Sequence, residues 1–176
     1  MNFADPKTNV LQMGLREGVK VADLGAGSGH YSLAAAHAVG VDGRVYAIDV
    51  QEDVLKRIQG TAREQGVRTI ETVWGDIEKP RGTTLRDQAV DGAILSNTLF
   101  QIKEKAIVAA ELRRILKPGG KLLVIDWAGA YGGLGPDPSH VVNEQAAEAV
   151  FAAAGFHVVK KFSAGPHHYG IVFTAP

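Results

Sequence analysis

The sequence predicts an α/β fold in which a mostly parallel sheet lies between layers of helices. Short apolar runs alternate along the chain with helix-like segments, which is the pattern of parallel strands joined by crossover helices. One such run leads into a glycine-rich turn at residues 25–29 and then into an alanine-rich helix. The last two predicted strands are joined by residues 163–167 alone. This connector is too short for a crossover helix, so those strands run antiparallel.

Length and composition predict a single soluble domain, residues 1–176. A chain of 176 residues that is 45% apolar and 22% charged can bury a sizeable core. Lys plus Arg and Asp plus Glu each number 19, so the net charge is zero and gives no basic footprint for nucleic acid. The oligomeric state is left open.

Several classes of site are excluded or disfavoured by residue usage. The chain has no cysteine, which rules out disulfides and thiolate chemistry and fits a reducing compartment. Its histidines lack metal-ligand spacing, so we expect no metal site. No apolar stretch approaches the ~18 residues of a membrane span, and no secretory leader is visible at the N-terminus. We therefore expect a cytoplasmic protein without a membrane span.

Residues 1–18 are predicted to form a short lead-in helix. Asp5 can cap it, with Pro6 at its first position. Gly18 ends the segment.

The chain is organised around residues 19–30. An apolar run ends in Asp23-Leu24, and Gly25, Gly27 and Gly29 follow at alternate positions. Glycine tolerates positive φ and lets a ligand lie against bare backbone. The first N–H groups of the following helix, residues 31–39, have no intrahelical partner. We expect a polar ligand cradle at the carboxyl end of this strand.

The pattern Asp23-x-Gly25-x-Gly27-x-Gly29 resembles motif I of the class I S-adenosylmethionine (SAM)-dependent methyltransferases. Dinucleotide-binding folds carry G-x-G-x-x-G instead, whereas here the third glycine comes one residue early and an acid precedes the first. An acid suits the cationic amino group and sulfonium of SAM. A tight turn whose glycines serve packing alone remains the alternative.

This resemblance implies a Rossmann-like three-layer sandwich with strand order 3-2-1-4-5-7-6 and an antiparallel last strand. In its finer features, notably the Gly-Pro loop before His140 and the final His-Tyr strand, the chain looks most similar to the ubiquinone/menaquinone-biosynthesis-like (type 11) small-molecule group. The implied cofactor is SAM, and the implied partner is a small-molecule methyl acceptor. In such enzymes the N-terminal segment often covers the cofactor. Phe3 is therefore a candidate lid residue, and a helix packed on the sheet edge is the alternative.

The second predicted strand, residues 43–49, ends in Asp49. An acid at the tip of this strand can accept both ribose hydroxyls as charge-assisted hydrogen bonds. The resemblance implies that Asp49 and Val50 contact the cofactor. Capping of the next helix, which starts near Gln51 and stops at Gly66, is the alternative role for Asp49.

The third predicted strand, residues 69–74, is followed by Gly75-Asp76-Ile77. The turn resembles the family's adenine-contacting turn. By that resemblance the Asp76 carboxylate would accept the adenine amino group, and the Ile77 N–H would meet a ring nitrogen. On its own, Gly-Asp after a strand is only a turn signal.

The fourth predicted strand, residues 89–97, leads into Asn97-Thr98-Leu99-Phe100. Some methyltransferases carry Asn/Asp-Pro-Pro-Tyr/Phe here and use it to hold a planar amino nitrogen. The departure from that signature argues against methylation of adenine N6 or of glutamine. Asn97 either contacts cofactor or substrate or is simply a polar residue at a strand end.

The remaining elements complete the alternation of helices and strands. A break at Lys117-Pro118-Gly119-Gly120 is predicted to end one helix and turn the chain into the sheet. A Gly- and Pro-rich loop at 128–142 is long enough to be functional or mobile. The other predicted elements are helices at 103–116 and 143–154 and strands at 121–127, 156–162 and 168–174.

Four residues near the expected mouth of the cofactor pocket are candidates for the acceptor side. Trp127 and Tyr169 offer flat apolar faces, and His140 and His168 offer a proton acceptor near neutral pH. We expect one of these histidines to lie near the path of the methyl group and to contact or deprotonate the acceptor.

The sequence thus predicts methyl transfer from SAM by in-line SN2 attack. Three alternatives remain. A non-catalytic SAM-binding sensor or scaffold would show the same cofactor motif. A nicotinamide-linked oxidoreductase is disfavoured by the glycine spacing and the reversed last strand. A nucleic-acid methyltransferase is disfavoured by the zero net charge and the lack of a recognition domain.

Overall fold

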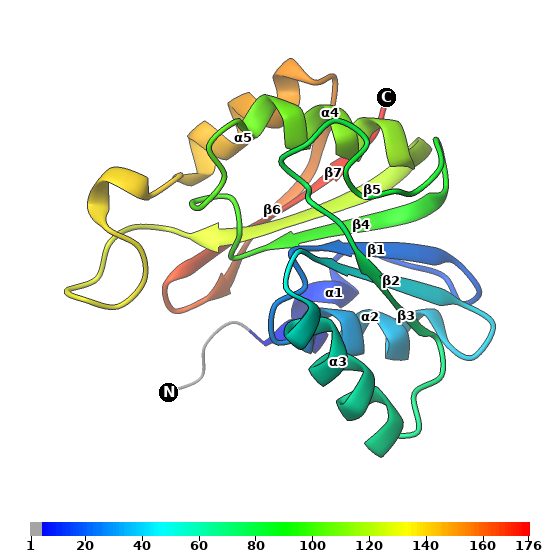
Figure 1. The fold of residues 1–176 in the computed structure, drawn as a ribbon. Helices are drawn as coiled ribbons and strands as arrows, with labels where there is room; N and C mark the ends of the chain where they lie inside the picture. Colours follow the sequence, from blue (N-terminus) through cyan, green and yellow to red (C-terminus); the bar gives the residue numbers. More distant parts are fainter. Residues whose placement is uncertain (1–4) are drawn as a thin grey trace.

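The computed structural model describes residues 5–176, and Phe3, the candidate lid residue, lies outside this range. The fold is a seven-stranded sheet in the order β3-β2-β1-β4-β5-β7-β6 (Figure 1). β7 runs antiparallel to both of its neighbours, while the pairs among β1 to β5 are parallel. The predicted order and the reversed last strand are confirmed. The strands are β1 (Lys20–Leu24), β2 (Arg44–Asp49), β3 (Ile70–Trp74), β4 (Val90–Ser96), β5 (Leu116–Trp127), β6 (His157–Gly165) and β7 (His168–Thr174).

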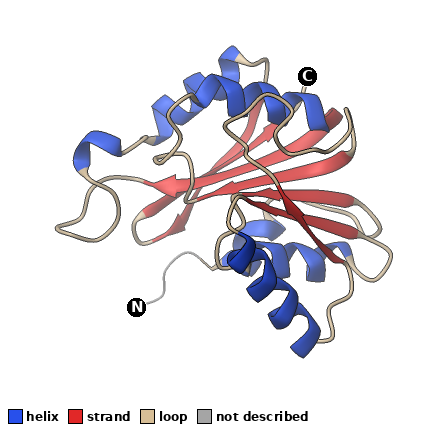
Figure 2. Cartoon of the chain, in the orientation of Figure 1, coloured by secondary structure: helices blue, strands red, loops and turns tan. Residues whose placement is uncertain are grey.

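Helices cover both faces of the sheet, which gives the predicted three layers (Figure 2). In the view of Figure 1, α4 and α5 lie above the sheet, and α1, α2 and α3 lie below it. No helix within residues 5–176 is long and apolar enough to cross a membrane. The helices are α1 (Pro6–Leu11), α2 (His30–Val39), α3 (Glu52–Glu64), α4 (Lys105–Ile115) and α5 (Glu144–Ala153), with a 3₁₀ turn, η1 (Pro138–His140).

Alternation along the strands divides the core into two apolar layers. Leu122 and Val124 of β5 join a cluster with Leu112 and Phe151 from α4 and α5. Leu123 of β5 points to the other face, where its cluster includes residues of α1 and α2. Because both faces of the central strands are buried, β1, β4 and β7 are mostly buried along their length, whereas the edge strands β3 and β6 are partly exposed.

The lead-in helix forms as the sequence predicts. Asp5 is the N-cap of α1, and its carboxylate accepts hydrogen bonds from the backbone N–H groups of Lys7 and Thr8. Pro6 occupies the first helical position, where its missing N–H costs nothing.

The predicted break at residues 117–120 takes a different form. α4 ends at Ile115 and β5 begins at the next residue, so Pro118, Gly119 and Gly120 belong to the strand. A register shift between Val90 and Gly92 of β4 marks an irregular start to the β4–β5 pairing. The N–H of Gly119 donates to the Ala175 carbonyl, and the Ala175 N–H donates to the Gly120 carbonyl. The glycines therefore bend the first part of β5 within the sheet.

β6 is also longer than predicted, because residues 163–165 continue its pairing with β7 through an irregular register. The connector between the two strands is thereby reduced to Pro166 and His167.

Candidate active site

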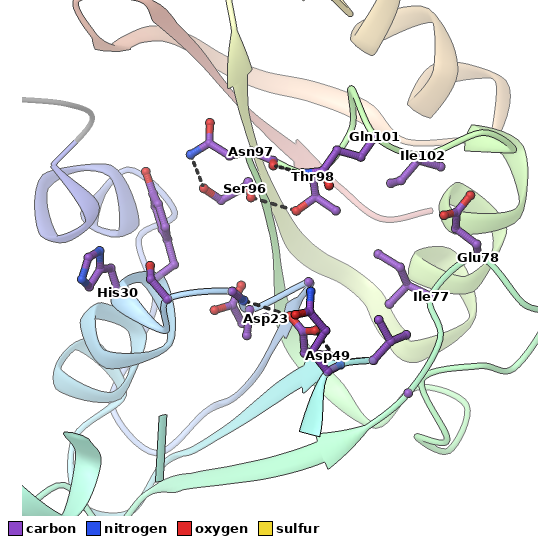
Figure 3. Close-up of a pocket in the computed structure, with 18 of the residues that line it drawn as sticks. Asp23, His30, Asp49, Ile77, Glu78, Ser96, Asn97, Thr98, Gln101 and Ile102 are labelled. Atoms are coloured by element: carbon purple, nitrogen blue, oxygen red, sulfur yellow. Dashed lines mark hydrogen bonds between the residues drawn. The ribbon is translucent and has the colours of Figure 1, made fainter. Parts of the chain in front are cut away.

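A cavity of about 500 Å³ opens at the carboxyl ends of the parallel strands (Figure 3). This volume falls within the ordinary range of small-molecule sites. The turns after β1, β2, β3 and β4 supply most of its lining, and Trp127 of β5 and His168 of β7 close one side. The position is the one at which open α/β sheets bind ligands.

The glycine turn after β1 is held in left-handed backbone. Gly25, Gly27 and Gly29 have φ values of 71°, 50° and 78°. The N–H groups of Gly25 and Ala26 both donate to the Ile48 carbonyl, which ties the turn to β2. Gly25 and Gly27 line the cavity. Gly29 lies behind them as the N-cap of α2, where an added Cβ would come within 2.7 Å of the Ile58 side chain.

Asp23 and Asp49 lie at the strand ends beside this turn. Asp23 is buried and its Oδ2 accepts a hydrogen bond from Ser32 Oγ at 2.6 Å. Burial, reinforced by the nearby charge of Asp49, raises the pKa of Asp23 to about 6, although the Ser32 bond opposes the shift. Asp49 accepts from Gly27 N–H at 3.0 Å and from Gln51 N–H at 2.9 Å. Each Asp49 oxygen retains a lone pair for a ligand hydroxyl.

The turn after β3 brings Asp76 and Ile77 to the cavity wall. Asp76 accepts from Glu78 N–H through Oδ1 and forms an ion pair with Lys79 through Oδ2, both at 3.1 Å. Val50 also lines the cavity. The turn is therefore held in place by its own carboxylate.

Asn97, at the end of β4, has left-handed backbone with φ of 52° and lines the cavity. Its N–H donates to the Ile125 carbonyl at 2.8 Å, and its Nδ2 contacts Ser96 Oγ at 3.4 Å. The buried Oδ1 atom has no hydrogen-bond partner among residues 5–176. A buried acceptor without a partner is costly, so a ligand donor would satisfy it.

Asp126, which the sequence reasoning did not single out, lies beside the site but does not line the cavity. It is fully buried, and its carboxylate accepts from Leu99 N–H at 2.9 Å and from Trp127 N–H at 2.8 Å. Burial raises its pKa to about 6 against these hydrogen bonds. Asp126 thus fastens the segment after Asn97 to β5. The available signal was a third acid near a strand end, after Asp23 and Asp49.

Trp127 and His168 are register partners across β5 and β7, and both line the cavity. Their ring centroids lie 4.3 Å apart. His168 is 5% exposed, and its Nδ1 atom has no hydrogen-bond partner within the described part of the chain. Burial, followed by the neighbouring His167, lowers the pKa of His168, so its imidazole is neutral at pH 7.

His140 and Tyr169 are not among the residues that line the cavity. His140 lies exposed at the end of η1. Tyr169 follows His168 on β7 and so points to the opposite face, where its hydroxyl donates to the Val142 carbonyl at 2.9 Å. Of the four acceptor-side candidates, the structure brings only Trp127 and His168 together.

Residues from the N-terminal part of the chain also line the cavity, and the sequence reasoning did not identify them. Pro6, His30 and Tyr31 line it. The Tyr31 hydroxyl accepts from Asn9 Nδ2 at 3.0 Å, and Asn9 also donates to the Ala164 carbonyl of β6. Tyr31 could have been suspected because it follows the glycine turn directly. The remaining lining residues that were missed are Ala26, Ser28, Gln51, Gly75, Glu78, Ser96, Thr98, Gln101 and Ile102.

The polar lining of the cavity consists largely of carboxylate, amide and hydroxyl groups. Across residues 5–176 no group of three or more His, Cys, Asp or Glu side chains is arranged to hold a metal ion. Carboxylates and the unpartnered Asn97 Oδ1 face the cradle, which suits a ligand rich in hydroxyl and amino donors.

A family model and two curated proteins that resemble this chain are all described as methyltransferases. A family model described as a methyltransferase domain matches residues 15–163. The ubiquinone/menaquinone biosynthesis C-methyltransferase UbiE of Paraburkholderia xenovorans is 31% identical over 160 residues, covering 91% of this chain and 61% of that protein. A demethylmenaquinone methyltransferase of Staphylococcus aureus is 30% identical, covering 65% of this chain and 45% of that protein. The chain therefore spans about half to three fifths of the length of these curated relatives.

Among solved structures, a SAM-dependent methyltransferase from Aquifex aeolicus superposes with a TM-score of 0.88 and 30% sequence identity. The match covers 98% of this chain and 90% of that chain.

Proposed function

The chain belongs to the methyltransferase domain family, and from this premise we propose that it transfers a methyl group from SAM to a small-molecule acceptor. The observation that carries the proposal is the cradle of Gly25 and Gly27 between the carboxylates of Asp23 and Asp49. We further propose that residues 1–176 act as one domain, in which the lead-in segment 1–18 borders the site through Pro6.

The cavity residues fit SAM by the chemistry of their donors and acceptors. Asp49 and Val50 are proposed to hold the ribose. Asp76 and the Ile77 N–H are proposed to hold the adenine. The methionine moiety is assigned to the glycine cradle with Asp23, and to Asn97, whose Oδ1 lacks a partner among the described residues. Each assignment pairs a cofactor group with a residue of complementary chemistry that lines the cavity.

When bound, SAM supplies a methyl carbon on a sulfonium: the bond to the acceptor forms as the carbon–sulfur bond breaks, and sulfur keeps the electron pair. The protein then mainly has to hold the acceptor close and aligned, which contributes roughly 7–11 kcal/mol in favourable cases. Trp127 offers a flat surface for orienting the acceptor. His168 Nδ1, neutral and unpartnered in residues 5–176, is the proposed proton acceptor for an ionisable acceptor group.

Calorimetric titration of the chain with SAM, S-adenosylhomocysteine and NAD tests the cofactor assignment. We expect both SAM and S-adenosylhomocysteine to bind, with no heat from NAD, and radiolabelled methyl transfer to at least one member of a small-molecule acceptor panel. Binding of NAD without SAM would overturn the proposal. Binding of SAM without transfer across a broad panel would favour a sensor role.

Histidine variants test the acceptor side once an acceptor is known. His140 and His168 are both proposed acceptor-side residues, and His168 has the stronger support because it lines the cavity. We expect His168→Ala to lower kcat/KM at least tenfold with an unchanged SAM affinity, and His140→Ala to have the smaller effect. Full turnover by the double variant would refute a histidine role.

A further inference from the structure

The connection between β3 and β4, residues 75–89, combines the proposed adenine turn with an unusual backbone. Arg81, Thr84 and Gln88 have φ values of 58°, 59° and 52°, although none of them is glycine. Such residues are strained in left-handed backbone and persist only where surrounding contacts over-determine them. The contacts that hold this segment should therefore matter for what it does.

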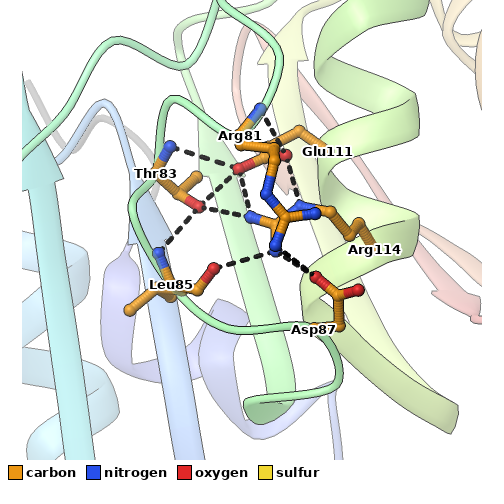
Figure 4. A network of polar contacts seen from close by, with 6 residues as sticks. All are labelled: Arg81, Thr83, Leu85, Asp87, Glu111 and Arg114. Atoms are coloured by element: carbon orange, nitrogen blue, oxygen red, sulfur yellow. Dashed lines mark hydrogen bonds and ion pairs between the residues drawn. The ribbon is translucent and has the colours of Figure 1, made fainter.

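Glu111 of α4 supplies the contacts at Arg81 and Thr83 (Figure 4), and the Gln88 N–H donates to the Arg114 carbonyl. Glu111 is 3% exposed. Its Oε1 accepts from Thr83 N–H at 3.2 Å and from Thr83 Oγ1 at 2.5 Å, and its Oε2 accepts from Arg81 N–H at 3.2 Å. One buried carboxylate on α4 thus holds the backbone of the 75–89 segment at two points, Arg81 and Thr83.

Arg114, one turn further along α4, completes the network. It binds both oxygens of Glu111, through Nε at 2.8 Å and Nη2 at 2.7 Å. Its Nη1 donates to the Leu85 carbonyl at 2.8 Å and to Asp87 at 2.6 Å. Burial pushes the pKa of Glu111 upward, but the bonds from Arg114 and Thr83 outweigh it, so the carboxylate stays ionised.

The segment held by Glu111 and Arg114, residues 81–87, packs directly against the proposed adenine turn. A Cβ on Gly82 would overlap the Asp76 carbonyl, and a Cβ on Gly75 would come within 2.6 Å of the Gly82 carbonyl. Lys79 N–H donates to the Asp76 carbonyl, and Gly82 N–H donates to the Lys79 carbonyl. A shift of Thr83 would therefore displace the backbone that carries Asp76 and Ile77.

We propose that Glu111, held by Arg114, is a positioning residue that sets the turn of Asp76 and Ile77 for reading the adenine ring of the cofactor. This inference rests on the proposed function. A buried ion pair is by itself a weak source of stability, since desolvation offsets the attraction. Its distinctive contribution here is geometric, because five hydrogen bonds converge on one carboxylate.

The test compares two ligands that differ at the adenine amino group, S-adenosylhomocysteine and S-inosylhomocysteine. In the full chain we expect S-adenosylhomocysteine to bind roughly tenfold or more tightly, because only its amino group can donate to Asp76. In Glu111→Gln we expect this ratio of dissociation constants to fall toward one, chiefly by weaker binding of S-adenosylhomocysteine. General loss of stability would weaken both ligands alike and leave the ratio unchanged.

Two further variants make the result decisive. Ile115→Val lies on the same helix and truncates a core side chain that is 0% exposed, so it controls for destabilisation and should keep the full ratio. Arg114→Lys keeps the charge but loses the forked contacts, and should lower the ratio as Glu111→Gln does. If Glu111→Gln does not fold, Arg114→Lys decides the question.

The outcomes separate this inference from the proposed function. Failure of the unmodified chain to bind S-adenosylhomocysteine would contradict both. Normal binding with no preference over S-inosylhomocysteine would overturn the adenine assignment of Asp76 and the positioning role together, and would leave SAM-dependent methyl transfer standing. An undiminished ratio in a folded Glu111→Gln or Arg114→Lys variant would overturn the positioning role alone.

Discussion

At the scale of single residues, three aspartates near the strand ends do different work because their surroundings differ. Asp49 lines the cavity, and its carboxylate accepts hydrogen bonds from two backbone N–H groups. Asp23 and Asp126 are more deeply buried, and burial raises the pKa of each to about 6. The same residue type thus borders the cavity at Asp49 and holds backbone segments together inside the protein at Asp126.

Asp49→Ala should weaken SAM binding by roughly 10- to 100-fold. It removes two charge-assisted hydrogen bonds to the ribose, and water recovers part of the loss. Calorimetric titration measures the change, with Asp53→Ala on the exposed start of α3 as the control. Unchanged affinity in a folded Asp49→Ala variant would remove the ribose assignment.

Gly27→Val should abolish SAM binding while costing less in folding. Gly27 has φ of 50°, which a β-branched residue adopts only under strain. An added Cβ would meet only the Gly25 carbonyl oxygen, at 3.8 Å, so the valine side chain would compete with a ligand more than with the fold. Thermal unfolding separates the cost in stability from the loss of binding. A variant that binds SAM normally would show that the glycine turn is not the cradle.

At the scale of elements, backbone contacts rather than side chains decide several features. The predicted break at Lys117–Gly120 was placed at the right residues, but pairing with Ala175 keeps it within β5. Local sequence signals a bend there, because Pro lacks an N–H and Gly permits positive φ. Whether the bend leaves the sheet depends on a distant strand partner, which local sequence does not contain.

Gly82→Ala should disrupt the segment between β3 and β4. Its Cβ would overlap the Asp76 carbonyl, which is backbone and cannot rotate aside. We expect a lower melting temperature and weakened SAM binding together, measured by thermal unfolding and titration. Gly60→Ala, which meets open space on the middle of α3, is the matched control and should keep or gain stability. Wild-type behaviour of Gly82→Ala would mean that the turn is free to move.

At the scale of the whole molecule, the buried acids should make stability depend on pH. The pKa of Asp126 is raised from 3.8 to about 6 on folding, so the folded state binds its proton more tightly. Its stabilising contribution is full below about pH 4 and is lost as the pH rises through about 6.

Denaturant unfolding of the ligand-free chain between pH 4 and pH 7 measures this effect. Relative to Asp126→Asn, the chain should lose stability across that range by an amount on the order of 1–3 kcal/mol. Asp42→Asn, at an exposed turn, is the control and should follow the unmodified chain. Parallel curves for the chain and Asp126→Asn would show that the carboxyl group does not titrate with folding.

The reversed last strand could be predicted from the sequence because the length of a connector is a local property. The strand order came instead from the resemblance to class I methyltransferases, since local sequence does not say which strands pair. Sequence reasoning placed Trp127 and His168 on the same side, since strand ends meet at one edge. It also grouped His140 and Tyr169 with them, and the structure does not. Tyr169 points away because neighbouring residues of a strand face opposite sides, and His140 depends on the path of the irregular segment 128–142.

The cavity is assembled from two separate parts of the chain. The turns after β1, β2, β3 and β4 supply most of the lining, while Trp127 and His168, which flank the segment 128–142 and the last helix, close one side. The groups proposed to hold the cofactor all lie in the first part, so the second part can be changed without altering them. Trp127→Ala should then lower turnover of the acceptor in a radiolabelled methyl-transfer assay and leave the calorimetric affinity for SAM as it was.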